Sequence, residues 1–389
     1  MVDFDEEINR IGTNSSKYDN MERLYGVAPD TGLSMWTADM DFRAPKCITE
    51  ALGKLIEHGI FGYYGDQINY NIAVTNWYSK RHSWEINPSW ISVCHGLVAG
   101  IGIAIRAFSE PGDGVIIFTP VYHSFISMVK ANNRYLNEQS LYIEHGEYFI
   151  DFDKLEKGMV GNEKILLFCS PHNPGGKVWS VNELEKIGAF CEKHDLILIS
   201  DEIHNDLVYS KSNHTVYPIA VTSITKRLVV LASASKTFNI AGGETGNVII
   251  EDEKLRKKFN NAHKAIGTTP NLFGMKIAES AYLYGEKWLE SLLPYLESNK
   301  VTFDLGISKI PGLNSMHLSS TYLAWVDFSQ TGLLEQEIIE RVHKKAKIAA
   351  SVGSTFGKGG ELFMRFNLAC PKAKINEAIS RLEAVFYDM

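Results

Sequence analysis

The chain alternates between two hydrophobic patterns from about residue 45 to about residue 285. One pattern places apolar residues three and four positions apart, as in a helix with one buried face. The other is a short, continuously apolar run ended by turn residues, typical of a strand covered on both faces of a parallel sheet. Such runs occupy residues 114–120, 164–171, 196–202, 227–236 and 247–252. The alternation predicts an α/β fold with a mostly parallel sheet.

Residues 181–195 supply the kind of connection that parallel strands need. Leu184, Ile187 and Phe190 would fall on one face of a helix there, between two of the apolar runs. In sheets of this type, ligands bind beyond the carboxyl ends of the strands. The residues that follow each run are therefore where we expect the chemistry.

The pattern changes after about residue 285. A long helical stretch runs through residues 288–300, and residues 313–328 and 361–371 resemble strands of a smaller α+β unit. No internal repeat or low-complexity linker interrupts the chain. We predict three parts in chain order: an N-terminal segment folded onto the smaller unit (1–44), a large domain (45–285) and a small C-terminal domain (286–389).

Composition and charge narrow the class of protein. Of the 389 residues, 45% are hydrophobic and 22% charged, as in globular proteins. The net charge of −7 is spread along the chain, which disfavours nucleic acid and anionic membranes as partners. The apolar runs fall far short of the ~20 residues of a membrane helix, and the acidic first residues are unlike a signal peptide. We therefore expect a cytoplasmic protein that acts on a small molecule.

The five cysteines show no spacing typical of a metal site. Cys47, Cys94, Cys169, Cys191 and Cys370 are odd in number and contain no CxxC pair. We predict neither a disulfide nor a metal centre, and interpret these residues as small hydrophobic side chains in a reducing compartment.

Four chemically different side chains follow the strand runs: Tyr122, Asn173, Asp201 and Lys236. An amine in a desolvated pocket can condense with an aldehyde, which suits Lys236. A carboxylate can pair with a protonated pyridine nitrogen, which suits Asp201. Asn173 can donate its amide to a phenolate oxygen, and Tyr122 can stack on a flat ring. Together they indicate a pyridine aldehyde as the ligand.

Two further groups suit a phosphate on the same ligand. Ser233 and Ser235 come just before the lysine, and their hydroxyls can bind phosphate. Backbone N–H groups at Gly96, Leu97 and Val98 lie where an apolar run opens into a predicted helix, which is a frequent phosphate site. The predicted cofactor is therefore pyridoxal 5′-phosphate.

Each of these residues also has an ordinary structural explanation when it is considered alone. Lys236 could be a solvated surface lysine, Asp201 a helix N-cap and Asn173 part of an Asx turn. Tyr122 could pack in the core, and the glycines near Gly96 could serve a tight turn. Their combination carries the prediction.

Seven ordered blocks then show a resemblance over essentially the whole chain. They are MWTADMDF (35–42), HGIFGYYG (58–65), TPVYHSF (119–125), CSPHNPGGKVW (169–179), SDEIHNDLVY (200–209), SKTFNIAG (235–242) and MRFNLACP (364–371). The chain resembles the fold-type I pyridoxal phosphate enzymes, the class I/II aspartate aminotransferase superfamily. Within it, the chain is most similar to the C–S lyase branch of bacterial cystathionine β-lyases and cysteine desulfhydrases.

The resemblance implies a fold and an activity. The fold would be a mostly parallel, seven-stranded sheet in a large cofactor domain beside a smaller α+β domain. The activity would be a C–S β-lyase that releases a thiol, pyruvate and ammonia from cystathionine, cysteine or a related S-substituted cysteine. Two alternatives stay open: an aminotransferase, which uses the same residues, and a pyridoxal phosphate-binding regulatory protein without turnover.

The resemblance also implies roles for particular residues. Lys236 would form the Schiff base and act as the catalytic base, Asp201 would hold the pyridine nitrogen, and Tyr122 would stack on the ring as a third catalytic residue. Asn173 and His204 would lie beside the phenolic oxygen, with Asn173 also near the substrate. The phosphate would be held by Ser233, Ser235, Gly96, Leu97 and Val98.

Three other implications concern the substrate and the subunits. Arg365 would bind the substrate carboxylate, and Trp36 and Asp39 would line the substrate site. Tyr63 would reach the phosphate of a neighbouring subunit, which implies a homodimer with shared active sites. One position departs from the aminotransferases: Glu244 stands eight residues after the lysine, where they carry an arginine on the phosphate.

Overall fold

The continuously apolar runs form the core of a seven-stranded sheet in the computed structural model, which describes residues 2–387. The strands are β2 (Ile91–Cys94), β3 (Gly114–Thr119), β4 (Tyr135–Ser140), β7 (Glu163–Cys169), β8 (Ile197–Asp201), β9 (Leu228–Ala232) and β10 (Gly246–Ile249). Their order across the sheet is β2-β10-β9-β8-β7-β3-β4. Only β10 runs antiparallel to its neighbours, so the predicted α/β class and mostly parallel sheet are confirmed.

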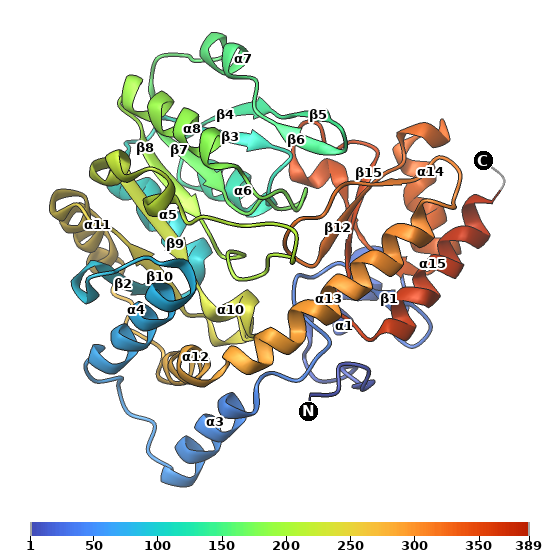
Figure 1. Cartoon of the computed structure of the whole chain (residues 1–389), viewed down its shortest axis with the longest axis horizontal. Coiled ribbons are helices and arrows are strands. Elements are labelled where there is room, and N and C mark those ends of the chain that lie inside the picture. The colour runs from blue at the N-terminus through green and yellow to red at the C-terminus, as the bar shows by residue number, and fades with distance from the viewer. Residues whose placement is uncertain (1, 388–389) are drawn as a thin grey trace.

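Helices cover both faces of this sheet (Figure 1). One face packs against α5 (Gly96–Phe108), α6 (His123–Ala131) and α11 (Glu253–Ile266). The other packs against α4 (Ile68–His82), α8 (Val181–Lys193) and α12 (Leu272–Tyr284). Successive residues of one strand point to opposite faces, so that strand must be apolar at every position. This is why the runs lack polar alternation.

The β7 strand shows the alternation directly. Ile165 and Leu167 belong to the cluster on the α5 face, whereas Leu166 and Phe168 belong to the cluster on the α8 face. All four side chains are almost fully buried. The strand is therefore held by apolar packing on both sides.

The predicted helix over residues 181–195 is α8, and it begins with a capping box. The Ser180 hydroxyl accepts the Glu183 N–H at 3.3 Å, and the Glu183 carboxylate accepts the Ser180 N–H at 2.9 Å. These bonds satisfy backbone donors that a helix start leaves free. Leu184, Ile187 and Phe190 are buried on the sheet, as the periodicity predicts.

The structure corrects the end of the apolar run at residues 227–236. Strand β9 ends at Ala232, and the last residues of the run form the short helix α10 (Ala234–Thr237). The turn begins at Ser233, whose hydroxyl accepts the Ser235 N–H at 3.1 Å. Lys236 therefore lies on a helical turn just beyond the sheet edge.

A smaller antiparallel sheet follows the long helix α13 (Glu286–Ile307). Its order is β11 (Asn314–Ser315), β12 (Leu323–Asp327), β15 (Phe363–Asn367) and β14 (Ser351–Val352). The helix α15 (Lys372–Phe386) lies beside α13 along this unit (Figure 1). The strands predicted within residues 313–328 and 361–371 are thus present.

The N-terminal residues lie against this smaller unit. The two-residue strand β1 (Leu33–Ser34) pairs in parallel with β13 (Ile348–Ala349), and the Asp41 N–H donates to the Ala369 carbonyl at 2.8 Å. Figure 1 shows this dark-blue segment among the orange and red elements. These contacts support the division that we propose, at residues 1–44, 45–285 and 286–389.

The remaining α-helices and strands are short or peripheral. They are α1 (Ser16–Asp19), α2 (Met21–Tyr25), α3 (Lys46–His58), α7 (Phe152–Lys157), α9 (Tyr217–Ala220), α14 (Glu335–Ile339), β5 (Tyr142–Glu144) and β6 (Glu147–Phe149). Over residues 2–387, the helices are too short or too polar for any of them to cross a bilayer.

Candidate active site

A cavity of about 610 Å³ opens at the carboxyl ends of the central strands. The large domain, the N-terminal segment and the smaller sheet all contribute to its walls. Eleven of the residues predicted from the sequence line it: Trp36, Gly96, Leu97, Val98, Tyr122, Asn173, Asp201, His204, Ser235, Lys236 and Arg365. Residues more than 300 positions apart in the sequence therefore meet in one place.

The Lys236 amine donates to the Ala38 carbonyl at 2.7 Å. Desolvation in the cavity lowers the pKa of Lys236 to about 8, although the charge of Asp39 opposes this shift. An amine with such a pKa is partly uncharged near neutral pH. It can therefore attack an aldehyde or take a proton, which a solvated lysine does poorly.

Asp201 ends β8, and its buried side chain reaches the same cavity. Burial raises the pKa of Asp201 to about 7, while the Ile203 N–H, which donates to Oδ1 at 3.2 Å, favours the charged form. No salt bridge in residues 2–387 neutralises this carboxyl group. A protonated ring nitrogen in the cavity would supply the missing partner.

Arg365 lies on β15 and is 4% exposed. Its Nη1 donates to the Asn173 Oδ1 at 2.9 Å, and its Nη2 donates to the Trp36 carbonyl at 2.9 Å. The Nε atom is buried without a hydrogen-bond partner, and among the described residues no carboxylate pairs with the guanidinium. Burial lowers the pKa of Arg365 to about 10. A buried cation with a free donor fits a carboxylate ligand.

His204 presents a second unused polar atom. Its Nδ1 is buried and has no hydrogen-bond partner. Burial lowers the pKa of His204 to about 3, and the positive charges of Lys236 and Arg365 contribute, so the ring is neutral at physiological pH. A neutral imidazole can exchange one hydrogen bond with a phenolic oxygen. The cavity therefore fits the predicted cofactor at its ring end.

The start of α5 forms another part of the cavity wall. His95 is its N-cap residue and makes no side-chain capping bond. Gly96 has φ of +73°, and a Cβ atom there would lie 2.6 Å from the Glu244 Oε2. The backbone angle favours glycine, whereas the flexible end of Glu244 could move away from a Cβ atom. The Gly96 N–H already donates to the Glu244 carbonyl at 3.1 Å, so the N–H groups of Leu97 and Val98 are those left to suit a phosphate, and the Glu244 carboxylate opposes one.

The two serines differ in their position. Ser235 lines the cavity, whereas Ser233 lies behind it and donates to the Thr245 carbonyl at 2.7 Å. The hydroxyls are 2.8 Å apart. Ser235 is thus placed to touch a phosphate, and Ser233 holds the turn that carries it.

Tyr122 caps α6 and lines the cavity, and its N–H donates to the Asn173 carbonyl at 3.1 Å. Two other predicted residues do not reach this space. Tyr63 is 96% exposed on the loop between α3 and α4. Asp39 forms ion pairs with Arg10 and Lys17 outside the cavity wall.

The sequence reasoning missed several lining residues. They are Ser16, Tyr25, Thr37, Ala38, His95, His123, Ile203, Ala241, Ser351, Thr355 and Phe356, together with Ile101 and Cys169 behind the helix start. His123 directly follows Tyr122 and could have been found from that neighbour. Ser351 lies on a strand of only two residues, and Thr355 and Phe356 follow that strand, which leaves no periodic signal.

Comparisons with known proteins agree with this geometry. Residues 34–382 match the family model described as aminotransferase class I and II. Cystathionine beta-lyase PatB of Bacillus subtilis is 39% identical over 98% of this chain and 99% of its own length. The structure of cystalysin from Treponema denticola, which contains pyridoxal 5′-phosphate, has a TM-score of 0.95 and 36% identity, and the match covers 100% of this chain and 99% of that one. The pyridoxal phosphate-bound C–S lyase from Staphylococcus hominis has a TM-score of 0.91 and 30% identity, over 99% and 98% of the two chains.

Proposed function

The chain belongs to the class I and II aminotransferase family, and from this premise we propose that it is a pyridoxal 5′-phosphate-dependent C–S β-lyase. The family resemblance stated from the sequence is confirmed. One observation carries the proposal: an amine, a carboxyl group and a guanidinium, none of them in a salt bridge within residues 2–387, line one cavity. They are Lys236, Asp201 and Arg365.

The substrate class follows from the relatives and from the cavity. The relatives named a cystathionine β-lyase and a C–S lyase support an amino acid with sulfur on Cβ. Cystathionine, cysteine or a related S-substituted cysteine would give a thiol, pyruvate and ammonia with the uptake of water. Arg365 would bind the α-carboxylate, because its Nε still lacks a partner.

The residues divide the work between binding and proton transfer. When bound, pyridoxal phosphate supplies an aldehyde for amines and a ring that withdraws electrons from the substrate Cα. Asp201 would hold a proton on the ring nitrogen, and Lys236 Nζ would bind the aldehyde of the cofactor. Lys236 Nζ would also take the proton from the substrate Cα, so that the sulfur can leave from Cβ. Tyr122, Asn173 and His204 orient the ring.

Product analysis tests the proposed reaction. The purified protein loaded with cofactor is expected to release pyruvate and a thiol from L-cystathionine without any added 2-oxo acid. The measurement is pyruvate by coupled reduction and thiol by a colorimetric reagent. If a new amino acid forms only when a 2-oxo acid is added, and neither pyruvate nor thiol appears, the protein is an aminotransferase instead.

A homodimer with shared active sites is also part of the proposal. Ile56, Ile60, Phe61, Tyr63 and Ile68 are exposed by more than half along one stretch of chain. Such an apolar run on a surface indicates an interface. A second copy of the chain would cover it and would bring Tyr63 toward the phosphate of that copy.

Mixing two defective variants tests the sharing of sites. Tyr63→Ala and Lys236→Ala are each expected to lower lyase activity as homodimers. In a mixed dimer, one of the two sites would have both residues intact, so co-expression should restore activity above that of either variant. Mixed dimers that are verified by native mass spectrometry and yet show no recovery would contradict shared sites.

Replacing Glu244 with glutamine is expected to strengthen cofactor binding. The carboxylate lies beside the start of α5, and glutamine removes its charge at nearly the same shape. Like charges a few Å apart repel by about 1 kcal/mol even with water-like screening, which predicts a gain of at least about fivefold in affinity. Titration of the cofactor-free protein followed by visible absorbance measures it. Glu251→Gln, on the surface beyond β10, is the control, and unchanged or weaker binding by Glu244→Gln would refute this role.

We also propose a cytoplasmic location. All five cysteines are free and four of them are buried, which supports a reducing compartment.

A further inference from the structure

The segment at residues 36–40 supplies backbone acceptors to both cations of the cavity. The Trp36 carbonyl accepts Arg365 Nη2 at 2.9 Å. The Ala38 carbonyl accepts Lys236 Nζ at 2.7 Å and the Tyr322 hydroxyl at 2.9 Å. A shift of this segment would therefore change the direction of the amine and of the guanidinium together.

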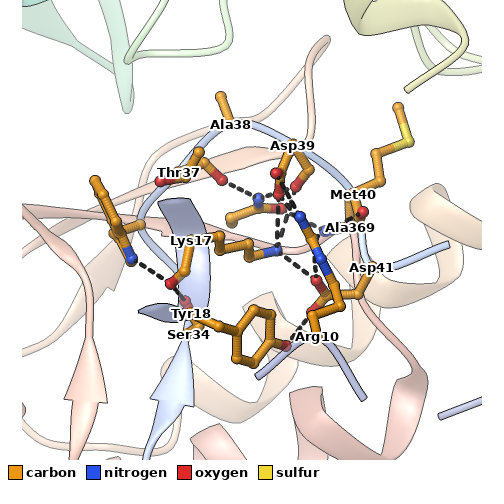
Figure 2. A network of polar contacts seen from close by, with 12 residues as sticks. Arg10, Lys17, Tyr18, Ser34, Thr37, Ala38, Asp39, Met40, Asp41 and Ala369 are labelled. Atoms are coloured by element: carbon orange, nitrogen blue, oxygen red, sulfur yellow. Dashed lines mark hydrogen bonds and ion pairs between the residues drawn. The ribbon is translucent and has the colours of Figure 1, made fainter. Parts of the chain in front are cut away.

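Two acidic side chains of this region are held in an ion network. Arg10 contacts both carboxylate oxygens of Asp39, at 3.0 and 2.7 Å, and reaches Asp41 Oδ1 at 2.8 Å. Lys17, which is 0% exposed, lies 3.1 Å from Asp41 Oδ1 and donates to the Asp39 carbonyl at 3.2 Å. Figure 2 shows Arg10 and Lys17 converging on Asp39 and Asp41 beneath Thr37 and Ala38.

Asp41, the more buried of the two acidic residues, has further partners. Asp41 Oδ2 accepts the Tyr18 hydroxyl at 2.7 Å, and Lys374 lies 3.5 Å away. Burial alone would raise the pKa of Asp41, but Lys17, Lys374 and Tyr18 lower it to about 2, so the carboxylate stays charged. Burying this many charges costs desolvation free energy that apolar packing would avoid. A network of this kind is better suited to fixing one geometry than to adding stability.

Two further bonds connect this geometry to the segment itself. The Lys17 carbonyl accepts the Trp36 indole N–H at 2.9 Å and the Ser34 hydroxyl at 2.6 Å. The side chain and the backbone of Lys17 thus hold both ends of the turn that runs from Trp36 to Asp39. Neither Arg10 nor Lys17 lines the cavity, so these contacts are their connection to it.

We propose that Arg10 and Lys17 are positioning residues: by holding Asp39 and Asp41, they fix the carbonyls that orient Arg365 and Lys236 for the carboxylate and amine of an amino acid. The role rests on the proposed function of the cavity. Apart from Lys236, the groups expected to hold the cofactor ring and phosphate come from α5, α10, β8 and the turns after β3 and β7, outside the segment at residues 36–40. Loss of the network should therefore weaken carboxylate binding more than cofactor binding.

Two matched arginine variants test this role in the cofactor-loaded protein. Arg10→Met breaks the ion pair with Asp39. Arg43→Met breaks a similar ion pair with Glu6, which has two hydrogen bonds of 2.8 and 2.6 Å, lies within the same N-terminal residues 1–44 and is exposed to solvent. The probe is propionate, a carboxylate without an amino group, so it can occupy the Arg365 site without reacting. Calorimetry gives its affinity and a visible titration gives that of the cofactor.

Arg10→Met is expected to weaken propionate binding about tenfold, the scale of one charge-assisted hydrogen bond, while Arg43→Met leaves it unchanged. Cofactor affinity should fall less than propionate affinity in Arg10→Met, because Lys236 is the one expected cofactor-binding group that is bonded to this segment, and it should be unchanged in Arg43→Met. Equal propionate affinity in Arg10→Met and the wild type would overturn the proposal. So would a parallel loss of propionate and cofactor affinity with a lower thermal midpoint, because that result describes a purely structural role.

A second variant covers the buried lysine. Lys17→Met with Asp41→Asn removes one charge of each sign, so no uncompensated carboxylate is left beside position 17. It is expected to lose propionate affinity as Arg10→Met does. A folded double variant with wild-type affinity for propionate would contradict the role of Lys17. If the double variant does not fold, the comparison of Arg10→Met with Arg43→Met tests the proposal. Because propionate binding needs no turnover, a failure to release pyruvate from cystathionine would count against the proposed function alone.

Discussion

Replacing Lys236 with alanine is expected to lower kcat/KM for pyruvate release by at least about 10²–10⁴-fold, the contribution of a positioned general base. The variant would lose the amine that holds the aldehyde carbon and the group that takes the Cα proton. Among residues 2–387, no other lysine lines the cavity, so no second primary amine is there to replace it. The rate of pyruvate formation from L-cystathionine measures the effect.

Lys193→Ala is the matched control, because that lysine is 62% exposed on α8 and pairs with Glu156. It should retain wild-type activity. Adding a small free amine should restore part of the activity of Lys236→Ala, since the missing function is a base and a nucleophile. Wild-type activity in Lys236→Ala would show that the base is assigned to the wrong residue.

Replacing Asp201 with asparagine is expected to lower kcat by about 10²–10³-fold, as removal of a group that stabilises charge in a transition state does elsewhere. Asparagine keeps the shape of the side chain but cannot hold a proton on the ring nitrogen. A cofactor analogue that is methylated at this nitrogen carries a permanent positive charge. This analogue should recover part of the activity in Asp201→Asn and none in Lys236→Ala. An undiminished kcat of Asp201→Asn with the normal cofactor would contradict the role of Asp201.

The cofactor-free protein offers an independent control on Asp201. Its pKa is raised from 3.8 to about 7 by burial, so the folded state binds a proton that the unfolded chain has lost. The resulting stabilisation is complete below pH 3.8 and disappears as the pH rises through about 7. Asparagine cannot titrate. The free energy of unfolding should therefore fall less over this window in Asp201→Asn than in the wild type.

Much of the large domain could be predicted because its strands are buried on both faces. That burial makes the runs apolar at each position, and the polar residues that follow them necessarily meet at one sheet edge. The end of β9 could not be predicted in the same way, because Ala234 is as apolar as the strand that precedes it. The hydroxyl of Ser233 stops the strand by accepting the Ser235 N–H.

The N-terminal network could not be predicted from local patterns. Arg10, Lys17, Asp39 and Asp41 belong to segments without helical or strand periodicity, and Lys374 joins them from the last helix. Charged residues in such segments are usually solvated, so a lysine that is 0% exposed leaves no sequence signal. The sequence placed Asp39 at the substrate site. The structure places the Asp39 side chain in ion pairs with Arg10 and Lys17, and Asp39 is not among the residues that line the cavity.

The central claim is that the amine of Lys236 and the carboxyl group of Asp201 serve one pyridine ring. Borohydride reduction of the cofactor-loaded protein, followed by peptide mass spectrometry, tests it most directly. The expected result is a phosphopyridoxyl group on Lys236 and loss of the visible absorption band. A label on another lysine, or an unlabelled Lys236 in protein that has bound the cofactor, would contradict the account.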